Sequence, residues 1–298
     1  MLKGGLHTHT TRSDGCDAPE VLLGKYRAAG YDFVAITDHR NYNLKNFAPE
    51  TGVLVVPGME VDRQITGDEG IHCFHCVCIG SEAGNGYAQD ELYPAGTVAD
   101  QAEFQPLLDE IHEKNNLTIY CHPMWSRTPA CEFNRMKGNF AMEIWNSGCA
   151  IENDLDTNAA YWDELLAQGQ RLWGAATDDG HAMDQHCRGW VRVNSENSVP
   201  AIREALRAGA FYSSCGPEIE DFYVENGVAH VRCSDAAEIT LRQLRAVYDV
   251  ARAKEGQALN EASFKIRRGG AGYVRAVVKD AQGRRAWSNP IFLEASDL

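Results

Sequence analysis

Two pairs of potential metal ligands stand one residue apart in this sequence. His7 and His9 lie in the segment GGLHTHT, and Asp179 and His181 lie in TDDGH. In an extended strand, side chains two residues apart leave the same face, so the members of each pair can bind one ion. The spacing therefore predicts two parts of a site for divalent metal ions.

Other histidines and carboxylates stand at or near the ends of expected strands. They are Asp14, His39, Glu60, His75 and His122. With the two pairs they exceed the roughly three to five ligands of one zinc or manganese ion, which predicts two or three ions with Glu60 as the bridging carboxylate. A lone histidine at a strand end is more often structural, and a structural metal cluster is an alternative, although closed structural sites usually rely on Cys.

The elements that must position these residues alternate between strand and helix patterns. Apolar runs such as DFVAITDH, GVLVVPGMEV and LTIYCHP are separated by amphipathic stretches such as ADQAEFQPLLDEIHEKNN. Seven or more such units favour a closed or nearly closed parallel barrel over an open sheet. Because the carboxyl ends of parallel strands meet at one rim, the candidate ligands would converge there.

The pattern changes after about Gly216. Segments such as HVRCSD, SFKIRRG and YVRAVVKDAQGRRAWSNPIFLE combine strand and turn signals, and DAQGR predicts a hairpin turn. We therefore expect an α/β domain over residues 1–215 and a small, all-β, sandwich-like domain over residues 216–298.

The motifs at these positions resemble those of the PHP (polymerase and histidinol phosphatase) family. They are His7-Thr-His9, Ser13-Asp14-Gly15, Thr37-Asp38-His39, Gly58-Met59-Glu60, His122-Pro123 and Asp179-Gly180-His181. The resemblance covers residues 1–215 and implies a distorted, TIM-like (β/α)7 barrel that binds two or three divalent ions (Zn, Mn or Fe) and hydrolyses phosphoesters. The tail, with ALRAGAFYSSCGPEI and AWSNPIFL, resembles the CehA/McbA branch, which includes carboxyl-ester and carbamate hydrolases.

The resemblance also implies how the ligands divide among the ions. The first ion would take His7, His9, Glu60 and Asp179, the second Glu60, His75 and His122, and the third Asp14, His39 and His181. Family members carry either His or Asp at the Asp14 position, so a weaker or absent third ion is the alternative. His72 is an alternative to His75, although HCVCIG fits the family's strand better.

Two further residues are predicted to act beside the ligands. Asp38 is expected to orient an imidazole, and His186 is a candidate acid for the leaving oxygen, with a surface histidine as the alternative. Glu143 in AMEIWN is a further candidate for orienting a ligand. Trp125 follows His122 by three residues and is a candidate for stacking on a substrate ring.

Three arginines follow the expected ligands closely in sequence. Arg40, Arg127 and Arg188 are predicted to bind the substrate phosphate, because a guanidinium group pairs with phosphate through two hydrogen bonds. Each is equally well explained as a solvated surface arginine.

The composition narrows the class of protein. The chain has 298 residues, 42 Asp and Glu, 28 Lys and Arg, and a formal net charge of −14. This balance argues against a nucleic-acid polymer as substrate, since such proteins usually cluster an excess of Lys and Arg. No apolar run reaches the roughly 18–20 residues of a membrane span and no signal peptide is recognisable, so we expect a cytoplasmic protein without membrane contact.

The sequence thus predicts a metal-dependent phosphoesterase that acts on a small phosphorylated molecule, such as a nucleotide or sugar phosphate. The nucleophile would be a metal-bridging hydroxide, because divalent ions lower the pKa of water from 15.7 toward about 7. A carboxyl-ester or carbamate hydrolase with the same centre is the alternative among enzymes. A binding module without catalysis is the alternative from another class.

Overall fold

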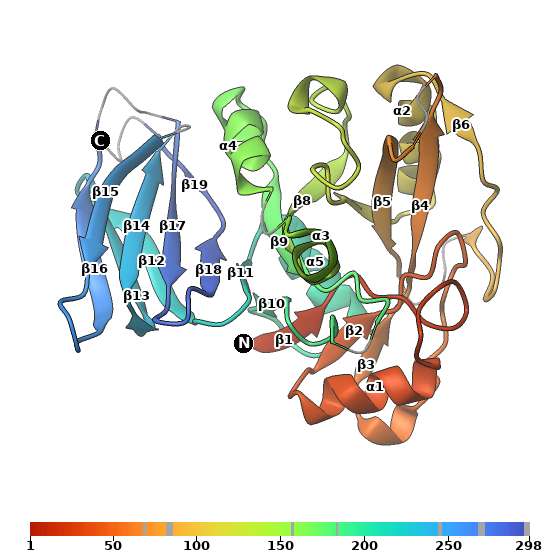
Figure 1. Ribbon diagram of the computed structural model, residues 1–298, viewed down its shortest axis with the longest axis horizontal. Helices are drawn as coiled ribbons and strands as arrows, with labels where there is room; N and C mark the ends of the chain where they lie inside the picture. The colour runs from red at the N-terminus through yellow and green to blue at the C-terminus, as the bar shows by residue number, and fades with distance from the viewer. Residues whose placement is uncertain are drawn as a thin grey trace.

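The computed structural model describes residues 1–67, 70–81, 86–155, 158–182, 184–243, 246–267 and 272–294. These residues form a long sheet, a six-stranded sheet and a three-stranded sheet, with α-helices packed beside the strands (Figure 1). None of the helices in these ranges is both long and apolar enough to cross a membrane.

The amino-terminal half of the long sheet holds the first ligand pair. Its strands are β1 (Leu2–Gly5), β2 (Phe33–Ala35), β3 (Leu54–Val56), β10 (Trp190–Val193) and β11 (Phe211–Ser214). β1, β2 and β3 are parallel, whereas β10 pairs antiparallel with both β1 and β11. Gly4 allows the close approach of β1 and β2, because a Cβ at this position would collide with the ring of Phe33.

The six-stranded sheet carries most of the remaining ligands. Its strands are β4 (Gly58–Ile65), β5 (Cys73–Ile79), β6 (Thr97–Val98), β7 (Leu117–Tyr120), β8 (Asn139–Asn146) and β9 (Trp173–Thr177). Their order is β6-β4-β5-β7-β8-β9, with β7, β8 and β9 parallel. β5 pairs antiparallel with both β4 and β7.

Amphipathic helices connect and cover these strands. The helices are α1 (Pro19–Ala28), α2 (Gln101–Glu113), α3 (Ser147–Asn153), α4 (Ala159–Ala167) and α5 (Val199–Ala208), with short 3-10 turns η1 (Pro49–Thr51) and η3 (Ala130–Glu132). Asp100 caps α2 by accepting hydrogen bonds from the backbone of Ala102 and Glu103. Phe104 and Leu108 of α2 pack in one hydrophobic cluster with strand residues of the six-stranded sheet.

The two sheets meet next to the ligands but do not form a continuous barrel of parallel strands. Within the described residues, they are joined by isolated bridges rather than by a ladder, including Thr8 with Gly180, His39 with Glu60 and Asn43 with Gly58. The expectation of a distorted, TIM-like (β/α)7 barrel is therefore met only in part. The main difference is the β4–β5 pair, whose connection over residues 66–72 is too short for the crossover that parallel strands require.

The β-rich segment expected after Gly216 is present. It comprises β12 (Ile219–Glu225), β13 (Val228–Ala236), β14 (Glu238–Gln243), β15 (Ala246–Arg252), β16 (Leu259–Lys265), β17 (Tyr273–Lys279), β18 (Arg285–Ser288) and β19 (Ile291–Phe292). β12, β13 and β16 form the three-stranded sheet, and β11 pairs with β18 so that the long sheet continues into the carboxyl-terminal strands. The three-stranded sheet and the carboxyl-terminal strands of the long sheet contribute to one hydrophobic cluster. The domain boundary between residues 215 and 216 stays a prediction.

A buried ion pair connects the carboxyl-terminal strands to α4. Arg275 of β17 is fully buried and donates from Nε and Nη2 to the two carboxylate oxygens of Asp163, at 2.8 and 2.6 Å. Tyr273 Oη donates to the same carboxylate at 2.9 Å, and the Arg275 guanidinium lies over the ring of Trp162. Helix α4 and strand β17 are thus held together by a buried ion pair with three hydrogen bonds.

Candidate metal centre

The structure gathers the nine candidate ligands into one cluster beside a cavity of about 290 Å³. The cavity lining includes Asp14, His39, Glu60, His75, His122, Asp179 and His181. His7 and His9 are fully buried and lie against Glu60 and Asp179. Residues that are far apart in the sequence therefore meet at one place.

Two of these residues reach the cluster by a route that the sequence did not indicate. Glu60 and His75 were expected at the ends of strands, yet each is the third residue of its strand, β4 or β5. In the antiparallel pair, Glu60 lies opposite Val77 and Asp62 lies opposite His75. Glu60 and His75 are therefore diagonal neighbours on the same face of the β4–β5 pair.

The first group consists of His7, His9, Glu60 and Asp179. His7 Nε2 and His9 Nε2 are 3.1 Å apart and lie 3.1 and 3.0 Å from Asp179 Oδ1. Each of these nitrogens is also 3.4 Å from one carboxylate oxygen of Glu60. Zinc ligands at about 2.0–2.1 Å in a tetrahedron are about 3.3 Å apart. The donor atoms thus have the spacing that such an ion requires.

Three buried polar atoms of the cluster lack a hydrogen-bond partner among the described residues. They are His39 Nδ1, Glu60 Oε2 and Asp179 Oδ1. His39 Nδ1 is 2.9 Å from Glu60 Oε2, yet these atoms form no hydrogen bond. An unpaired buried polar atom costs about 1–3 kcal/mol. Unpaired donor atoms gathered in this way fit ligands that share a cation, and the imidazole and carboxylate donors fit a divalent transition metal.

Glu60 also faces the ligands that the resemblance assigns to a second ion. Its Oε1 atom is 2.9 Å from His75 Nδ1 and 3.3 Å from His122 Nε2. The two oxygens of Glu60 thus face different sets of imidazoles, which is the arrangement of a bridging carboxylate. His72 instead pairs with Glu132 at 2.7 Å, so the structure places His75, not His72, beside Glu60.

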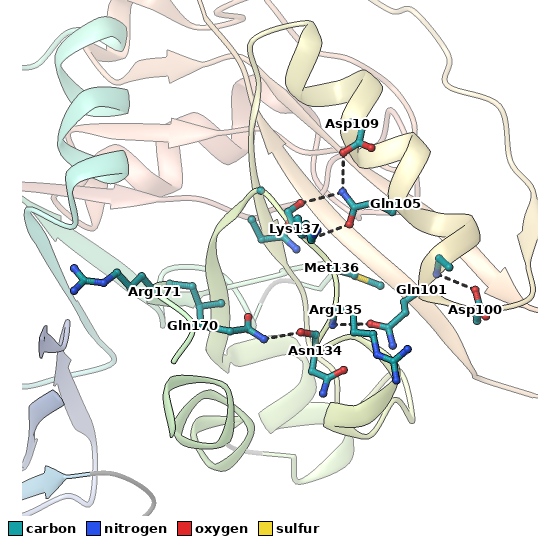
Figure 2. Close-up of a pocket in the computed structure, with 14 residues that line it drawn as sticks. Asp100, Gln101, Gln105, Asp109, Asn134, Arg135, Met136, Lys137, Gln170 and Arg171 are labelled. Atoms are coloured by element: carbon teal, nitrogen blue, oxygen red, sulfur yellow. Dashed lines mark hydrogen bonds between the residues drawn. The ribbon is translucent and has the colours of Figure 1, made fainter. Parts of the chain in front are cut away.

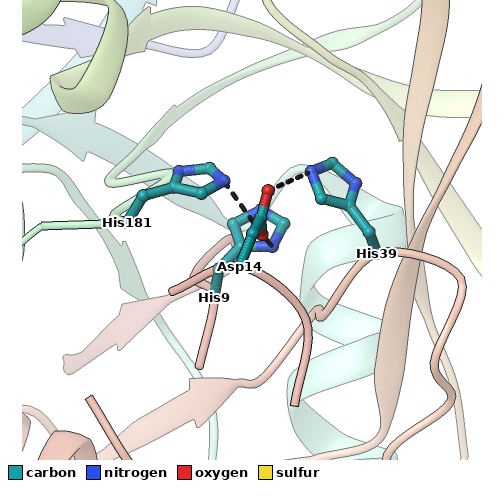
Figure 3. A group of neighbouring side chains, drawn as sticks. All are labelled: His9, Asp14, His39 and His181. Carbon is teal, nitrogen blue, oxygen red and sulfur yellow. Dashed lines mark ion pairs between the residues drawn. The ribbon is translucent and has the colours of Figure 1, made fainter. Parts of the chain in front are cut away.

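The third group surrounds the carboxylate of Asp14 (Figure 3). Asp14 lies 3.4 Å from His181 Nε2 and 3.6 Å from His39 Nε2. His9 joins this group, since its Nδ1 atom is 3.7 Å from Asp14. Asp14 is more exposed than the other ligands, with 53% of its side chain accessible. The third group therefore lies at the solvent side of the cluster.

The carboxylates and imidazoles shift each other's pKa values. Burial would raise the pKa of Glu60, but the charges of His7, His39 and His75 hold it well below its usual value. Burial would lower the pKa of His181, but its hydrogen bond to Asp14 and the charge of Asp179 raise it to about 9. Without metal, protonated His181 therefore compensates part of the negative charge, whereas burial lowers the pKa of His9 to about 4.

Metal binding to the third group is expected to weaken as the pH falls below about 9. His181, with a pKa of about 9 in the metal-free protein, is protonated at pH 7 and must lose that proton to bind an ion. The apparent Kd should rise by up to about tenfold for each pH unit between 9 and 7. Competition titrations with a chelator at pH 7, 8 and 9 measure this slope, and a Kd independent of pH would contradict it.

Glu143 is a fully buried carboxylate behind the first group. Its Oε1 atom accepts hydrogen bonds from His7 Nδ1 and Thr177 Oγ1, both at 2.6 Å. Its Oε2 atom accepts from the backbone N–H of His122 and from Asn146 Nδ2, both at 3.0 Å. The contact to Nδ1 leaves Nε2 of His7 for the ion, which is the usual arrangement behind a metal-ligating histidine.

Replacing Glu143 by Gln is expected to lower metal affinity by about 10- to 100-fold, since the neutral amide no longer stabilises the orientation of His7. Metal titration of the purified variant measures the loss. Thr177→Val, which removes a different hydrogen bond to the same carboxylate, serves as the control and should change the affinity less. Equal affinities for wild type and Glu143→Gln would contradict this role.

In the described part of the chain, Asp38 contacts no imidazole, contrary to the expectation from sequence. Its carboxylate accepts hydrogen bonds from the backbone N–H of Thr10 at 2.7 Å, from Thr10 Oγ1 at 2.8 Å and from Ser13 Oγ at 2.9 Å. Consecutive side chains of an extended segment point to opposite sides, so Asp38 and the neighbouring His39 diverge. Asp38 instead fixes the loop that carries Asp14.

His186 also does not line the cavity. It therefore cannot act there as the leaving-group acid that the sequence predicted. It is 6% exposed, and its Nδ1 atom lies 3.3 Å from Thr8 Oγ1. Burial lowers the pKa of His186 to about 4, so the ring is neutral near pH 7 and has no acidic proton to donate.

The three arginines expected to bind phosphate do not line the cavity. Arg40 forms an ion pair with Asp62, and Arg188 is exposed and donates from Nε to the backbone oxygen of Asp184 at 3.1 Å. Arg127 is exposed. Among the described residues, no Lys or Arg belongs to the cavity lining.

Other lining residues are Trp125, Cys149 and Glu152. The ring of Trp125 meets those of His122 and His75 edge to face, with centroids 5.0 and 5.8 Å apart. Glu152 of α3 accepts a hydrogen bond from Gln185 Nε2 at 2.5 Å. The sequence predicted a role for Trp125 because it follows His122 by three residues. It did not predict Glu152, which lies in the short helix α3 and belongs to no motif.

A larger cavity, of about 950 Å³, is lined by residues of α2 and of the segments before β8 and β9 (Figure 2). Its lining includes Leu172 just before β9, whereas the ligands Asp179 and His181 follow the other end of β9. In the cavity wall, Gln105 Nε2 donates a hydrogen bond to the backbone oxygen of Lys137, and Gln170 Nε2 donates to that of Asn134. None of the nine candidate ligands lines this cavity.

Solved structures share features of this fold. No protein-family model and no curated protein matches the chain. A two-domain protein from Bacteroides vulgatus ATCC 8482, containing a predicted PHP-like metal-dependent phosphoesterase, aligns with 98% of this chain and 87% of its own at 14% identity and a TM-score of 0.51. This likeness shows that the chain has the overall fold of that two-domain protein.

Two other structures align with 60% of this chain and 87% of their own. One is a proposed metal-dependent phosphoesterase from Bifidobacterium adolescentis ATCC 15703, with 13% identity and a TM-score of 0.43. The other is an amidohydrolase from Chromobacterium violaceum with bound sulfate and no metal, with 16% identity and a TM-score of 0.41.

Proposed function

We propose that this protein is a metal-dependent hydrolase of the PHP family that cleaves phosphoester bonds in a small phosphorylated molecule, of the nucleotide or sugar phosphate class. The main support is Glu60, whose two buried oxygens face imidazoles from separate segments of the chain while its Oε2 atom lacks a hydrogen-bond partner among the described residues. Such a carboxylate fits a bridge between divalent ions. The fold that this chain has in common with a protein containing a predicted PHP-like phosphoesterase agrees with this proposal.

The residues that would hold the ions are the three groups described above. Divalent ions bound there would lower the pKa of a water molecule and offset charge on the phosphoryl group. Glu143 would keep His7 in the orientation that binds metal, and Asp38 would keep the loop of Asp14 in place. Trp125 would contact the leaving group, because it stands beside the ligands at the cavity wall.

One observation favours the second candidate, a carboxyl-ester or carbamate hydrolase. The arginines expected to bind phosphate do not line the cavity, and the lining includes the carboxylates of Asp14 and Glu152. The charge of a phosphate would therefore be met by the metal ions alone. A neutral ester carries no charge that the site would have to compensate.

We further propose that residues 1–215 form a distorted barrel of the PHP type and that residues 216–298 form a small, all-β, sandwich-like domain. Membership of the CehA/McbA branch is proposed from the tail motifs alone. The cytoplasmic location, the small phosphorylated partner and the absence of a nucleic-acid polymer as substrate stay predictions of the same kind.

The test uses the full-length protein, stripped with a chelator and reloaded with Mn²⁺, Zn²⁺ or Fe²⁺. Hydrolysis of p-nitrophenyl phosphate, p-nitrophenyl acetate and a panel of nucleotide and sugar phosphates is then measured. Metal-dependent turnover of a phosphate supports the proposal, and turnover of the acetate alone supports the second candidate. If nothing is hydrolysed with any metal, both fail.

A matched pair of variants ties the activity to the cluster. His75→Ala removes a residue beside Glu60, whereas His72→Ala removes a neighbouring histidine that pairs with Glu132 instead. Activity should be lost in the first and kept in the second. Loss of activity in neither variant would show that the measured hydrolysis does not come from this site.

A further inference from the structure

We propose that Cys16, Asp17 and His186 form a separate site for a transition-metal ion of the zinc class. One ligand atom from each residue lies within 4.8 Å of the other two. His186 Nε2 is 3.6 Å from Asp17 Oδ2, close to the spacing of nitrogen and oxygen ligands around one zinc ion. Neither the proposed hydrolase activity nor the nine candidate ligands account for this group.

His186 has the environment of a metal ligand. The residue is 6% exposed, and its Nε2 atom is buried without a hydrogen-bond partner among the described residues. The other ring nitrogen, Nδ1, lies 3.3 Å from Thr8 Oγ1. A proton on Nδ1 that is donated to Thr8 leaves the lone pair of Nε2 directed at Asp17 and Cys16. Metal-ligating histidines usually have such a partner on the opposite nitrogen.

The backbone keeps the other two residues in place. Cys16 N–H donates to the backbone oxygen of His181 at 2.8 Å, and Thr11 N–H donates to that of Asp17 at 2.9 Å. The ring of His186 lies directly against Gly180, where a Cβ would collide with it. Cys16 is exposed, so one coordination position of an ion would remain open to solvent.

This group is distinct from the proposed catalytic centre. None of its three residues lines the cavity over the nine candidate ligands. Its donors also differ, because a thiolate with an imidazole and a carboxylate favours zinc, cobalt or cadmium over magnesium or calcium. The catalytic cluster consists of imidazoles and carboxylates.

Lys25 competes with an ion for this group. Its ammonium forms an ion pair with Asp17 Oδ2. A bound ion would have to replace Lys25 as the cation beside Asp17, so Lys25 weakens the site. Removal of this lysine should therefore strengthen metal binding.

The experiment is a Cd²⁺ titration of the full-length, reduced protein, followed by the ultraviolet charge-transfer band of a cadmium–thiolate bond. The band should appear in wild type and in Cys131→Ser, which removes another exposed thiol. It should be lost in Cys16→Ser and weakened at least tenfold in apparent affinity in His186→Ala. Lys25→Met should lower the half-saturating Cd²⁺ concentration by about tenfold.

A second measurement covers variants that fold poorly. Cd²⁺ should protect one thiol of the wild-type protein from a thiol-specific reagent, and peptide mapping should identify that thiol as Cys16. The proposal is overturned if Cys16→Ser keeps the full charge-transfer band, or if Cys16 reacts equally fast with and without Cd²⁺. Unchanged Cd²⁺ affinity in Lys25→Met would remove Asp17 from the ligand set and thereby overturn the site as proposed.

Discussion

Replacing Glu60 by Gln is expected to lower the rate of metal-dependent hydrolysis by about a thousandfold, which corresponds to about 4 kcal/mol of transition-state stabilisation. Glu60 is fully buried, and its carboxylate lies within 3.4 Å of five imidazoles. A neutral amide offers neither the charge nor the second anionic oxygen that a bridge between two ions requires. Metal analysis should show fewer bound ions, and assays with excess metal should not restore the rate.

Glu132→Gln provides the matched control for this prediction. Glu132 also contacts a histidine, His72, but this pair lies outside the cavity lining. Its replacement should leave both the metal content and the rate within about twofold of wild type, since the partly exposed pair touches none of the nine candidate ligands. Wild-type metal content in Glu60→Gln would show that Glu60 is not a ligand.

Replacing Arg275 by Met is expected to lower the free energy of unfolding by about 3–5 kcal/mol. Among the described residues, the substitution leaves the buried carboxylate of Asp163 with Tyr273 as its one side-chain hydrogen-bond donor. Arg242 Nη1 is 3.7 Å from Asp163 Oδ2, beyond hydrogen-bond distance. Urea unfolding of the metal-free protein, followed by circular dichroism, measures the change.

The exposed pair of Arg232 and Asp221 is the control for the buried one. These side chains are 3.7 Å apart and largely accessible, so Arg232→Ala should change the free energy of unfolding by less than about 1 kcal/mol. The double variant Asp163→Leu, Arg275→Met should regain much of the loss, because no buried charge is left unpaired. A loss for Arg275→Met no larger than that of the control would contradict the assigned role.

The sequence was most informative where two ligands share one short segment. The spacing of His7 and His9 and of Asp179 and His181 specifies a common side of the chain, and the structure places both pairs in the cluster. Glu60 and His75 were predicted as ligands at strand ends, and the structure brings them to the cluster from within the antiparallel β4–β5 pair instead. An apolar run does not tell whether its strand is parallel or antiparallel to the next one.

Predictions based on adjacency in sequence were less successful. Arg40 follows His39 directly, yet it has a φ of 51° and its side chain pairs with Asp62. Arg127 has a φ of 58° and is exposed. Left-handed backbone conformations redirect the chain within one residue, and no motif in the sequence indicates them for arginine. The contact between Glu143 and His7 joins residues 136 positions apart and depends on packing of whole strands.

The continuity of the long sheet has a consequence for how this chain is made. β1 at the amino terminus pairs with β10, which pairs with β11, and β11 pairs with β18 near residue 288. These pairings join early residues to late ones, so the contact order of the sheet is high. A nascent chain on the ribosome can complete this sheet only after the residues through β18 and β19 have emerged. Until then the edge of β11 has no partner, and folding of the two regions is expected to be coupled rather than stepwise.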